Sequence, residues 1–258
     1  MSTSGAGAPR SEGRIVVNNT DPLKNIRVVL TRPSHPGNIG ASARALKTMG
    51  LRTLHLVNPR HFPHPDADAR ASGARDVLQD AQVHESLAAA LGGCVLAVGT
   101  SSRHRELQHD LKSARDAARE LLAAAATHQV ALVFGNETTG LTSVEAGLCQ
   151  LWACIPANPD YASLNLAAAV QVFAYELRMA CESDVVRNDA EFEPATLADV
   201  ERLYEHFGQT MTATGFHDPA HPKRLMPRLR RLLARARLET EEVNILRGFL
   251  NSVDKSRR

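Results

Sequence analysis

Residues 130–141, VALVFGNETTGL, and residues 151–176, LWACIPANPDYASLNLAAAVQVFAYE, decide the fold of this chain. Each stretch begins with a short apolar run typical of a buried β-strand, and a polar loop of mostly small side chains follows it. From Ser163 the second stretch continues into a segment with helical periodicity. Because parallel strands end at one edge of a sheet, the two loops predict a small-molecule pocket at the carboxyl edge.

Strand-like and helix-like segments alternate before this stretch. Asn38 can cap the first helix, Ile39, Ala43, Leu46 and Met49 form its apolar stripe, and Gly50 ends it. Such alternation favours an α/β fold, a parallel sheet with helices packed on it. Strands are predicted at 26–30, 54–57 and 94–98, and helices at 38–50, within 59–80 (with Ala69, Gly73 and Ala74 on its packed face), at 81–91 and at 112–126.

Composition narrows the class of protein. The chain is 43% hydrophobic but only 4% aromatic, which suits alanine- and leucine-rich helices on a sheet. Its four cysteines form no C-x-x-C pair, so neither a metal site nor a disulfide framework is expected. Because free cysteines are typical of reducing compartments, we expect a cytoplasmic location. No apolar run is long enough to span a membrane, and the amino terminus has no signal-peptide core.

Charge and patterning divide the chain into four parts. Residues 1–23 are predicted to be a disordered tail, and 24–181 the α/β domain. Residues 182–196 form an acidic linker, and 197–258 a helical extension. Within the extension, helices are predicted at 197–214, 223–237 and 239–252, with apolar stripes on the first and last.

Three loops after predicted strands are candidates for the pocket. They contain Thr100-Ser101-Ser102, Gly135-Asn136-Glu137, and Ala162-Ser163-Leu164 with Ile155 ahead of it. Backbone groups in such loops can bind a heterocycle and a ribose without bulky side chains. Alternatively, these are ordinary turn residues, since glycine and serine commonly follow strands. The chain contains neither a G-x-G-x-x-G nor a Walker A motif.

Two charged residues near these loops are open to two interpretations. Arg44, on the side of its helix away from the apolar stripe, is either a surface arginine or a residue that holds a phosphate or an activated hydroxyl. Glu137 is either a carboxylate at a helix start, favoured by the helix dipole, or a member of the site.

The segment 223–237, KRLMPRLRRLLARAR, contains seven basic residues and no acidic one. Arginines at spacings of three and four form one helix face, which could merely be solvated. No acidic residue at these spacings could form ion pairs with them. The pattern therefore favours a surface for a nucleic-acid backbone, formed by Lys223, Arg224, Arg228, Arg231 and Arg235.

Three motifs carry a resemblance to a known family. HPGNIGASARALKTMGL at 35–51, VFGNETTGL at 133–141 and IPANPDYASLNLAAAVQVFAYEL at 155–177 together resemble the SPOUT RNA methyltransferases. MTATGF at 211–216 and the helices after it are similar to the bacterial TrmJ family of tRNA (cytidine/uridine-2′-O-)-methyltransferases. The resemblance covers about residues 25–253.

The resemblance implies a deep trefoil knot around 155–165, a homodimer, and methylation of nucleotide 32 in the tRNA anticodon loop without a metal. It implies that Arg44 is catalytic, with Asn38 and Ser163 beside it, and that Arg105 binds RNA. S-adenosyl-L-methionine (AdoMet) is implied to bind Thr100, Ser101, Ser102, Gly135, Ile155, Ala162, Ser163 and Leu164.

Asn136 departs from the family pattern, in which an arginine often follows the strand glycine. The absence of this arginine removes a positive charge near the pocket. It puts the RNA contacts or the substrate range in doubt more than AdoMet binding. Two alternatives stay open: methylation of another tRNA position or of ribosomal RNA, and a non-catalytic RNA-binding protein that keeps the fold.

Overall fold

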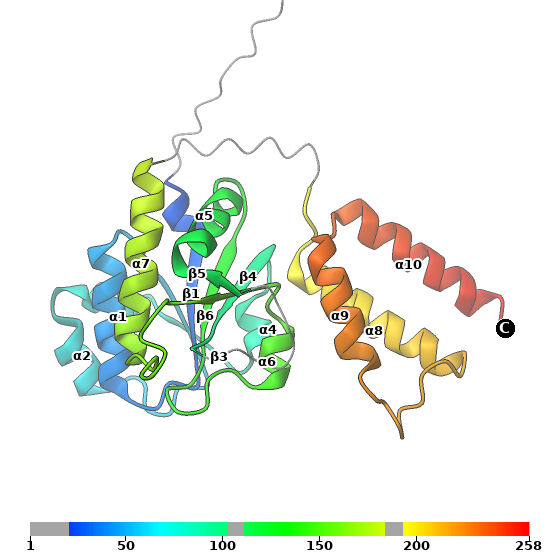
Figure 1. Ribbon diagram of the computed structural model, residues 1–258, viewed down its shortest axis with the longest axis horizontal. Helices are drawn as coiled ribbons and strands as arrows, with labels where there is room; N and C mark the ends of the chain where they lie inside the picture. Colours follow the sequence, from blue (N-terminus) through cyan, green and yellow to red (C-terminus); the bar gives the residue numbers. More distant parts are fainter. Residues whose placement is uncertain (1–20, 103–110, 184–192, 258) are drawn as a thin grey trace, which may run out of the picture.

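The computed structural model describes residues 21–102, 111–183 and 193–257. Its centre is a sheet of seven strands in the order β3-β2-β1-β6-β4-β7-β5, and every pair is parallel (Figure 1). The predicted parallel α/β fold is therefore confirmed. The strands are β1 (Ile26–Thr31), β2 (Thr53–Val57), β3 (Gln82–His84), β4 (Leu96–Thr100), β5 (Leu111–Ser113), β6 (Val130–Phe134) and β7 (Leu151–Cys154).

Helices cover both faces of the sheet because its central strands are apolar on both sides. In β1, Val28 and Leu30 belong to one buried cluster, while Val29 belongs to the other. The first face carries α1 (Pro36–Thr48), α2 (Pro65–Ala71), α3 (Arg75–Gln79), α5 (Ala114–Ala125) and α7 (Leu166–Ser183). The second carries α4 (Leu87–Ala90) and α6 (Ser143–Gly147), and two 3₁₀ helices, η1 (Pro22–Asn25) and η2 (Ser72–Ala74), complete the domain.

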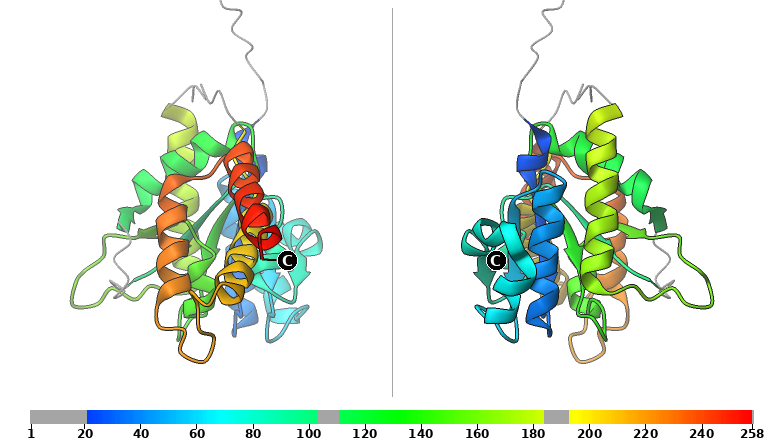
Figure 2. Two further views of the ribbon diagram at one scale, coloured as in Figure 1. Left: turned by 90° about the vertical axis from the view of Figure 1, so that its right-hand side faces the viewer. Right: turned by 90° about the vertical axis from the view of Figure 1, so that its left-hand side faces the viewer.

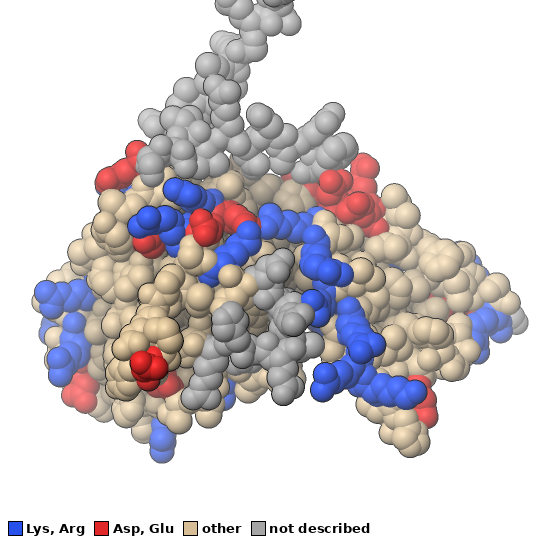
Figure 3. Space-filling view, viewed as in Figure 1, with Lys and Arg blue, Asp and Glu red and all other residues tan. Residues whose placement is uncertain are grey.

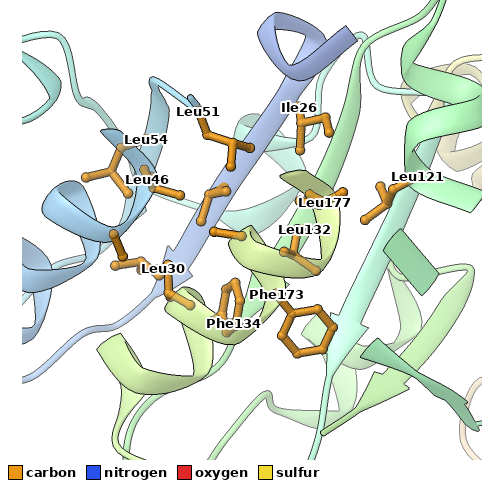
Figure 4. Packing of buried hydrophobic residues seen from close by; sticks show 14 of the residues in the cluster. Ile26, Leu30, Leu46, Leu51, Leu54, Leu121, Leu132, Phe134, Phe173 and Leu177 are labelled. Atoms are coloured by element: carbon orange, nitrogen blue, oxygen red, sulfur yellow. The ribbon is translucent and has the colours of Figure 1, made fainter. Parts of the chain in front are cut away.

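Strand β6 and helix α7 both contribute to the largest core cluster. All five residues of β6 are buried, and the ring of Phe134 meets that of Phe173 edge to face, with 5.6 Å between centroids (Figure 4). Aromatic pairs prefer this geometry because the positive ring edge faces the negative ring face. The stretch that decides the fold thus supplies the centre of the core.

The first helix explains two residues of the N-I-G motif. Ile39 is fully buried, as are Ala43 and Leu46 of the predicted stripe. A Cβ atom on Gly40 would lie 2.0 Å from the backbone oxygen of Ala67, so only glycine permits this approach of α1 to α2. Helices α1 and α7 lie side by side (Figure 2).

The extension consists of α8 (Leu197–Ala213), α9 (Leu225–Ala236) and α10 (Thr240–Lys255) around a small core that includes Leu203, Val243 and Leu250. Its attachment to the α/β domain is hydrogen-bonded. The N–H of Leu197 donates to the oxygen of Cys94 at 2.8 Å, and Arg237 on the extension forms an ion pair with Glu120 on α5. The extension is therefore fastened to the sheet domain.

Several predicted elements are wrong. Residues 81–91 contain the strand β3 and the short helix α4 rather than one helix, and 112–126 begins with β5 before α5. Both strands are three residues long at the sheet edges, too short to show an alternating pattern. The strand predicted at 94–98 is β4 at Leu96–Thr100. Between 59 and 80, the packed face contains Ala67, Ala71 and Ala74, whereas Ala69 and Gly73 are exposed.

The predicted boundaries also shift. The tail is predicted to reach residue 23, but Leu23 is fully buried in η1, whose first turn is capped by the Asp21 carboxylate. Helix α7 continues to Ser183, inside the predicted linker, and Ala195 near the linker's end is buried.

Candidate active site

Three of the predicted pocket positions meet at the carboxyl edge of the sheet. Thr100 ends β4, Gly135 follows β6 and Ile155 follows β7, and these three strands are neighbours in the order β6-β4-β7. The Thr100 hydroxyl donates to the backbone oxygen of Val133 at 3.1 Å. The N–H of Ser101 donates to the backbone oxygen of Ala153 at 3.0 Å. The loops therefore line one edge, as their positions predict.

Glu137 caps the amino-terminal end of α1 from a distant loop. Its carboxylate accepts hydrogen bonds from the N–H and hydroxyl of Ser34, from the N–H of His35 and from the side chain of Asn38. Partial burial opposes the charge, but these hydrogen bonds outweigh it and lower the pKa of Glu137 to about 2. Glu137 is therefore a carboxylate at the start of α1, reached from the loop after β6, and that loop begins with Gly135, one of the predicted pocket positions.

Asn38 is not the helix cap predicted from the sequence. Helix α1 begins at Pro36, and Asn38 is its third residue. Its amide nitrogen donates to Glu137 at 3.0 Å, and its amide oxygen accepts from the side-chain nitrogen of Asn165 at 2.9 Å. The oxygen of Asn165 in turn accepts the N–H of Ala167, which caps α7. One chain of hydrogen bonds thus joins the three motifs.

Asn136 organises the loop after β6. Its side-chain nitrogen donates to the backbone oxygen of Arg32 at 2.8 Å, and its side-chain oxygen accepts the N–H groups of Thr138 and Thr139 at 3.0 and 3.2 Å. The N–H of Gly140, which has a φ of +67°, closes the turn on the oxygen of Asn136 at 2.8 Å. A short amide both donates and accepts here, which gives this residue a structural role.

Arg32 is a residue of this region that sequence patterns did not reveal. It has a φ of +49°, and its guanidinium binds both carboxylate oxygens of Glu145, at 3.2 and 2.9 Å, and the backbone oxygen of Gly140 at 3.1 Å. It therefore ties the end of β1 to the loop after β6 and to α6. Its backbone conformation is unusual for a non-glycine residue, and no sequence pattern indicates it.

The remaining predicted site residues take no part in these contacts. Arg44 is exposed on α1, six residues beyond Asn38 and so about 9 Å further along the helix axis. Lys47, on the same side, forms an ion pair with Asp76 at 2.8 Å. Ser102 and Ser163 are exposed, Ala162 is half-buried, and Leu164 is 36% exposed. Arg105 falls outside the described residues.

The basic segment forms α9, and its cations gather on the side facing the viewer in Figure 3. Lys223, Arg224, Arg228 and Arg235 are exposed, and Arg231 is half-buried. Arg230 differs from them. Its guanidinium forms a two-point ion pair with Glu201 and stacks over the ring of Tyr204, 4.4 Å from the centroid. Arg230 is therefore committed to the internal packing of the extension.

Two further classes of site are not found in the described parts of the chain. Within residues 21–102, 111–183 and 193–257, no group of three His, Cys, Asp or Glu side chains is arranged to hold a metal ion. In the same ranges, no helix combines the length and apolarity needed to cross a membrane.

Comparisons with known proteins agree with this geometry. The model of the SpoU rRNA Methylase family matches residues 25–175, which contain the whole sheet and the hydrogen-bonded network. The model of the tRNA methyltransferase TrmJ C-terminal domain matches residues 198–258, which contain α9 and α10 and almost all of α8. The two matches divide the chain where the extension begins.

Individual relatives match both parts together. The tRNA (cytidine/uridine-2′-O-)-methyltransferase TrmJ of Salmonella typhimurium is 49% identical to this chain, over 92% of this chain and 99% of the relative. The TrmJ of Sodalis glossinidius is 47% identical, over 92% of this chain and 94% of the relative. The crystal structure of TrmJ from Z. mobilis aligns with a TM-score of 0.78 at 31% identity, over 88% of this chain and 98% of that one. The chain belongs to the TrmJ family, within the SpoU methylases.

Proposed function

We propose that the protein transfers a methyl group from AdoMet to the ribose 2′-hydroxyl of a cytidine or uridine at nucleotide 32 of the tRNA anticodon loop. The observation that carries this proposal is the hydrogen-bonded chain from Glu137 through Asn38 to Asn165. It holds the three family motifs together at the carboxyl edge of the sheet. The names of the TrmJ relatives supply the substrate class.

AdoMet is proposed to bind at this edge. Hydroxyl and backbone groups would come from Thr100, Ser101, Ser102 and Gly135, and apolar contacts from Ile155, Ala162 and Leu164, with Ser163 among them. Groups of this kind suit a nucleoside with an adenine ring and a ribose. AdoMet, when bound, supplies an electrophilic methyl group on a sulfonium.

Arg44 is proposed to act on the ribose. A guanidinium stays protonated at neutral pH, so it is a poor general base. It would instead orient the 2′-hydroxyl and stabilise the alkoxide that develops as the methyl group is transferred. Asn38 and Ser163 are proposed to assist at the same site. Because Arg44 lies exposed on α1, we propose a homodimer in which it serves the site at the subunit interface.

The extension is proposed to bind the tRNA backbone. Lys223, Arg224, Arg228, Arg231 and Arg235 would meet phosphates, and Arg105 is proposed to join them from the sheet domain. A knot formed around 155–165, the absence of a metal requirement and a cytoplasmic location complete the proposal.

Mapping of 2′-O-methyl groups in total tRNA tests the proposal directly. We expect a strain without this protein to lose the methyl group at nucleotide 32 and to regain it when the protein is restored. Retention of that group would contradict the proposed target, and loss at another position or in ribosomal RNA would identify a different one. Calorimetric titration with AdoMet is the second measurement, since a binding protein without catalytic activity would not take up the cofactor.

A further inference from the structure

Phe216 exposes its ring where the fold would normally bury one. It lies in the loop 214–224 between α8 and α9, hereafter the tip loop, and is 71% exposed. Gly215, with a φ of +76°, ends α8, and its N–H donates to the oxygen of Thr212 at 3.1 Å. An apolar residue after such a glycine commonly packs back onto the last helical turn. The exposed ring of Phe216 does not pack in this way.

The tip loop is held on both sides of this ring. The N–H of His217 donates to the oxygen of Met211 at 3.0 Å. Further on, the Asp218 carboxylate accepts the N–H of Ala220 at 2.9 Å and contacts the ring nitrogen of His221 at 2.9 Å. A ring presented by a fastened loop loses little conformational freedom when a flat ligand stacks on it.

The charges of the tip loop favour an anionic ligand. Asp218 is the one acidic residue in the tip loop, and its carboxylate is engaged within the loop. Lys223 and Arg224, at the other end of the loop, are both exposed and lead into the cations of α9. An exposed aromatic ring and exposed cations on one loop are the combination that binds unpaired nucleotides, because the base stacks on the ring while phosphates of the strand meet the charges.

The tip loop also lies on the side where a bound RNA could continue to the active site. Figures 1 and 2 show it at the lower end of the molecule, the end at which α1 begins. Helix α9 starts there and runs away from it. An RNA strand lying on α9 would therefore reach the tip loop at the end where α9 begins.

We propose that Phe216 stacks on an unpaired nucleobase of the RNA substrate, while Lys223 and Arg224 contact the adjoining phosphates. This inference rests on the proposed function and adds that the extension distinguishes unpaired from paired RNA. The basic face of α9 alone would bind either, since phosphates carry no such information.

The test compares two RNA probes with Phe216→Ala and Phe216→Trp. One probe is a hairpin with an unpaired loop, and the other is a fully paired duplex of the same length. We expect Phe216→Ala to weaken hairpin binding about tenfold and to leave duplex binding unchanged. Phe216→Trp keeps an aromatic ring at this position and should bind the hairpin as the unaltered protein does. Phe249→Ala, which removes a ring 62% exposed on α10, is the matched control and should alter neither affinity.

Fluorescence gives a direct reading of stacking. The chain has one tryptophan, Trp152, which is buried, so the tryptophan of the Phe216→Trp variant reports on the tip loop against a constant background. We expect the hairpin to quench the added emission and the duplex to leave it unchanged. If Phe216→Ala weakens binding of the hairpin and of the duplex equally, or weakens neither, the inference is overturned.

Two controls distinguish base stacking by Phe216 from a membrane contact and from the methyl transfer itself. If Phe216→Ala loses binding to phosphatidylserine vesicles and keeps its hairpin affinity, the ring belongs to a membrane contact and the inference is wrong. Methyl transfer to tRNA by the unaltered protein is measured in parallel. Absence of transfer together with the expected hairpin results contradicts only the proposed function, whereas transfer without a hairpin effect contradicts only the role of Phe216.

Discussion

The side-chain nitrogen of Asn165 lies 2.9 Å from the side-chain oxygen of Asn38, across 127 residues of sequence. Asn165 also caps α7 through the N–H of Ala167, so one side chain both starts a helix and reaches the first helix of the domain. Asn38 passes the connection on to Glu137. The start of α7, the start of α1 and the loop after β6 are therefore held in one arrangement.

Replacing Asn165 separates these two roles. Asn165→Asp keeps the oxygen that caps α7 but replaces the donor toward Asn38 with a second oxygen. We expect it to reduce methyl transfer while the melting temperature stays nearly unchanged. Asn165→Ala loses both roles, and the lost cap should cost about 1 kcal/mol of stability. Equal activity of Asn165→Asp and the unaltered protein would show that the link to Asn38 has no part in the site.

Arg44→Ala should reduce methyl transfer at least about a hundredfold, because it removes the group that stabilises the developing alkoxide. AdoMet affinity, measured by calorimetry, should be unaffected. Lys47→Ala is the control: it removes a cation from the same side of α1 that is paired with Asp76. Loss of AdoMet binding in Arg44→Ala would contradict the role assigned to this residue.

Neutralising Arg228, Arg231 and Arg235 to glutamine should weaken tRNA binding and flatten its dependence on salt. Each lost phosphate contact lowers the slope of log affinity against log salt by about one unit. Arg230→Gln is the contrasting variant, because Arg230 is paired with Glu201 and stacked on Tyr204. It should lower the melting temperature and leave the slope intact. An unchanged slope in the triple variant would return α9 to an ordinary solvated face.

Glu137 should make the protein sensitive to acid. Its pKa is lowered from 4.5 to about 2, so the folded state favours the ionised form. The stabilisation is complete above about pH 4.5 and is lost as the pH falls toward 2. Glu137→Gln should therefore unfold more easily in urea at pH 7, and its difference from the unaltered protein should shrink below pH 4.5. Glu205→Gln, an exposed position on α8, provides the comparison.

Asn136→Asp tests the turn after β6. The substitution keeps the oxygen that accepts from Thr138 and Thr139 but places a carboxylate against the backbone oxygen of Arg32. We expect weaker AdoMet binding, because Gly135 belongs to the same turn, and a lower melting temperature. If both values stay unchanged, the turn does not depend on the donor of Asn136.

Local patterns predicted the fold where they were long or strongly apolar. Helix α1 could be assigned from sequence because its apolar residues recur at helical spacing, and strand β6 because its five residues form one continuous apolar run. Strands β3 and β5 could not, because three residues at a sheet edge contain no period and take their conformation from β2 and β7.

The candidate site divides in the same way. The positions of Thr100, Gly135 and Ile155 followed from strand ends, whereas the partners of individual side chains did not. Glu137 bonds to Ser34 across 103 residues, and Arg32 to Glu145 across 113. Such contacts depend on how distant segments meet, so neither could be read from spacing. Asn136 was a departure from a pattern in the sequence and became a defined turn residue only with its partners in place.

The network from Glu137 through Asn38 to Asn165 also limits when the site can exist during synthesis. Its members come from the first quarter of the chain and from two segments beyond its middle. A nascent chain still lacking residue 165 has α1 but neither the cap of α7 nor the third member of the network. The ribosome must therefore release most of the sheet domain before the site can assemble, and translation pauses ahead of that point would hold an incomplete protein.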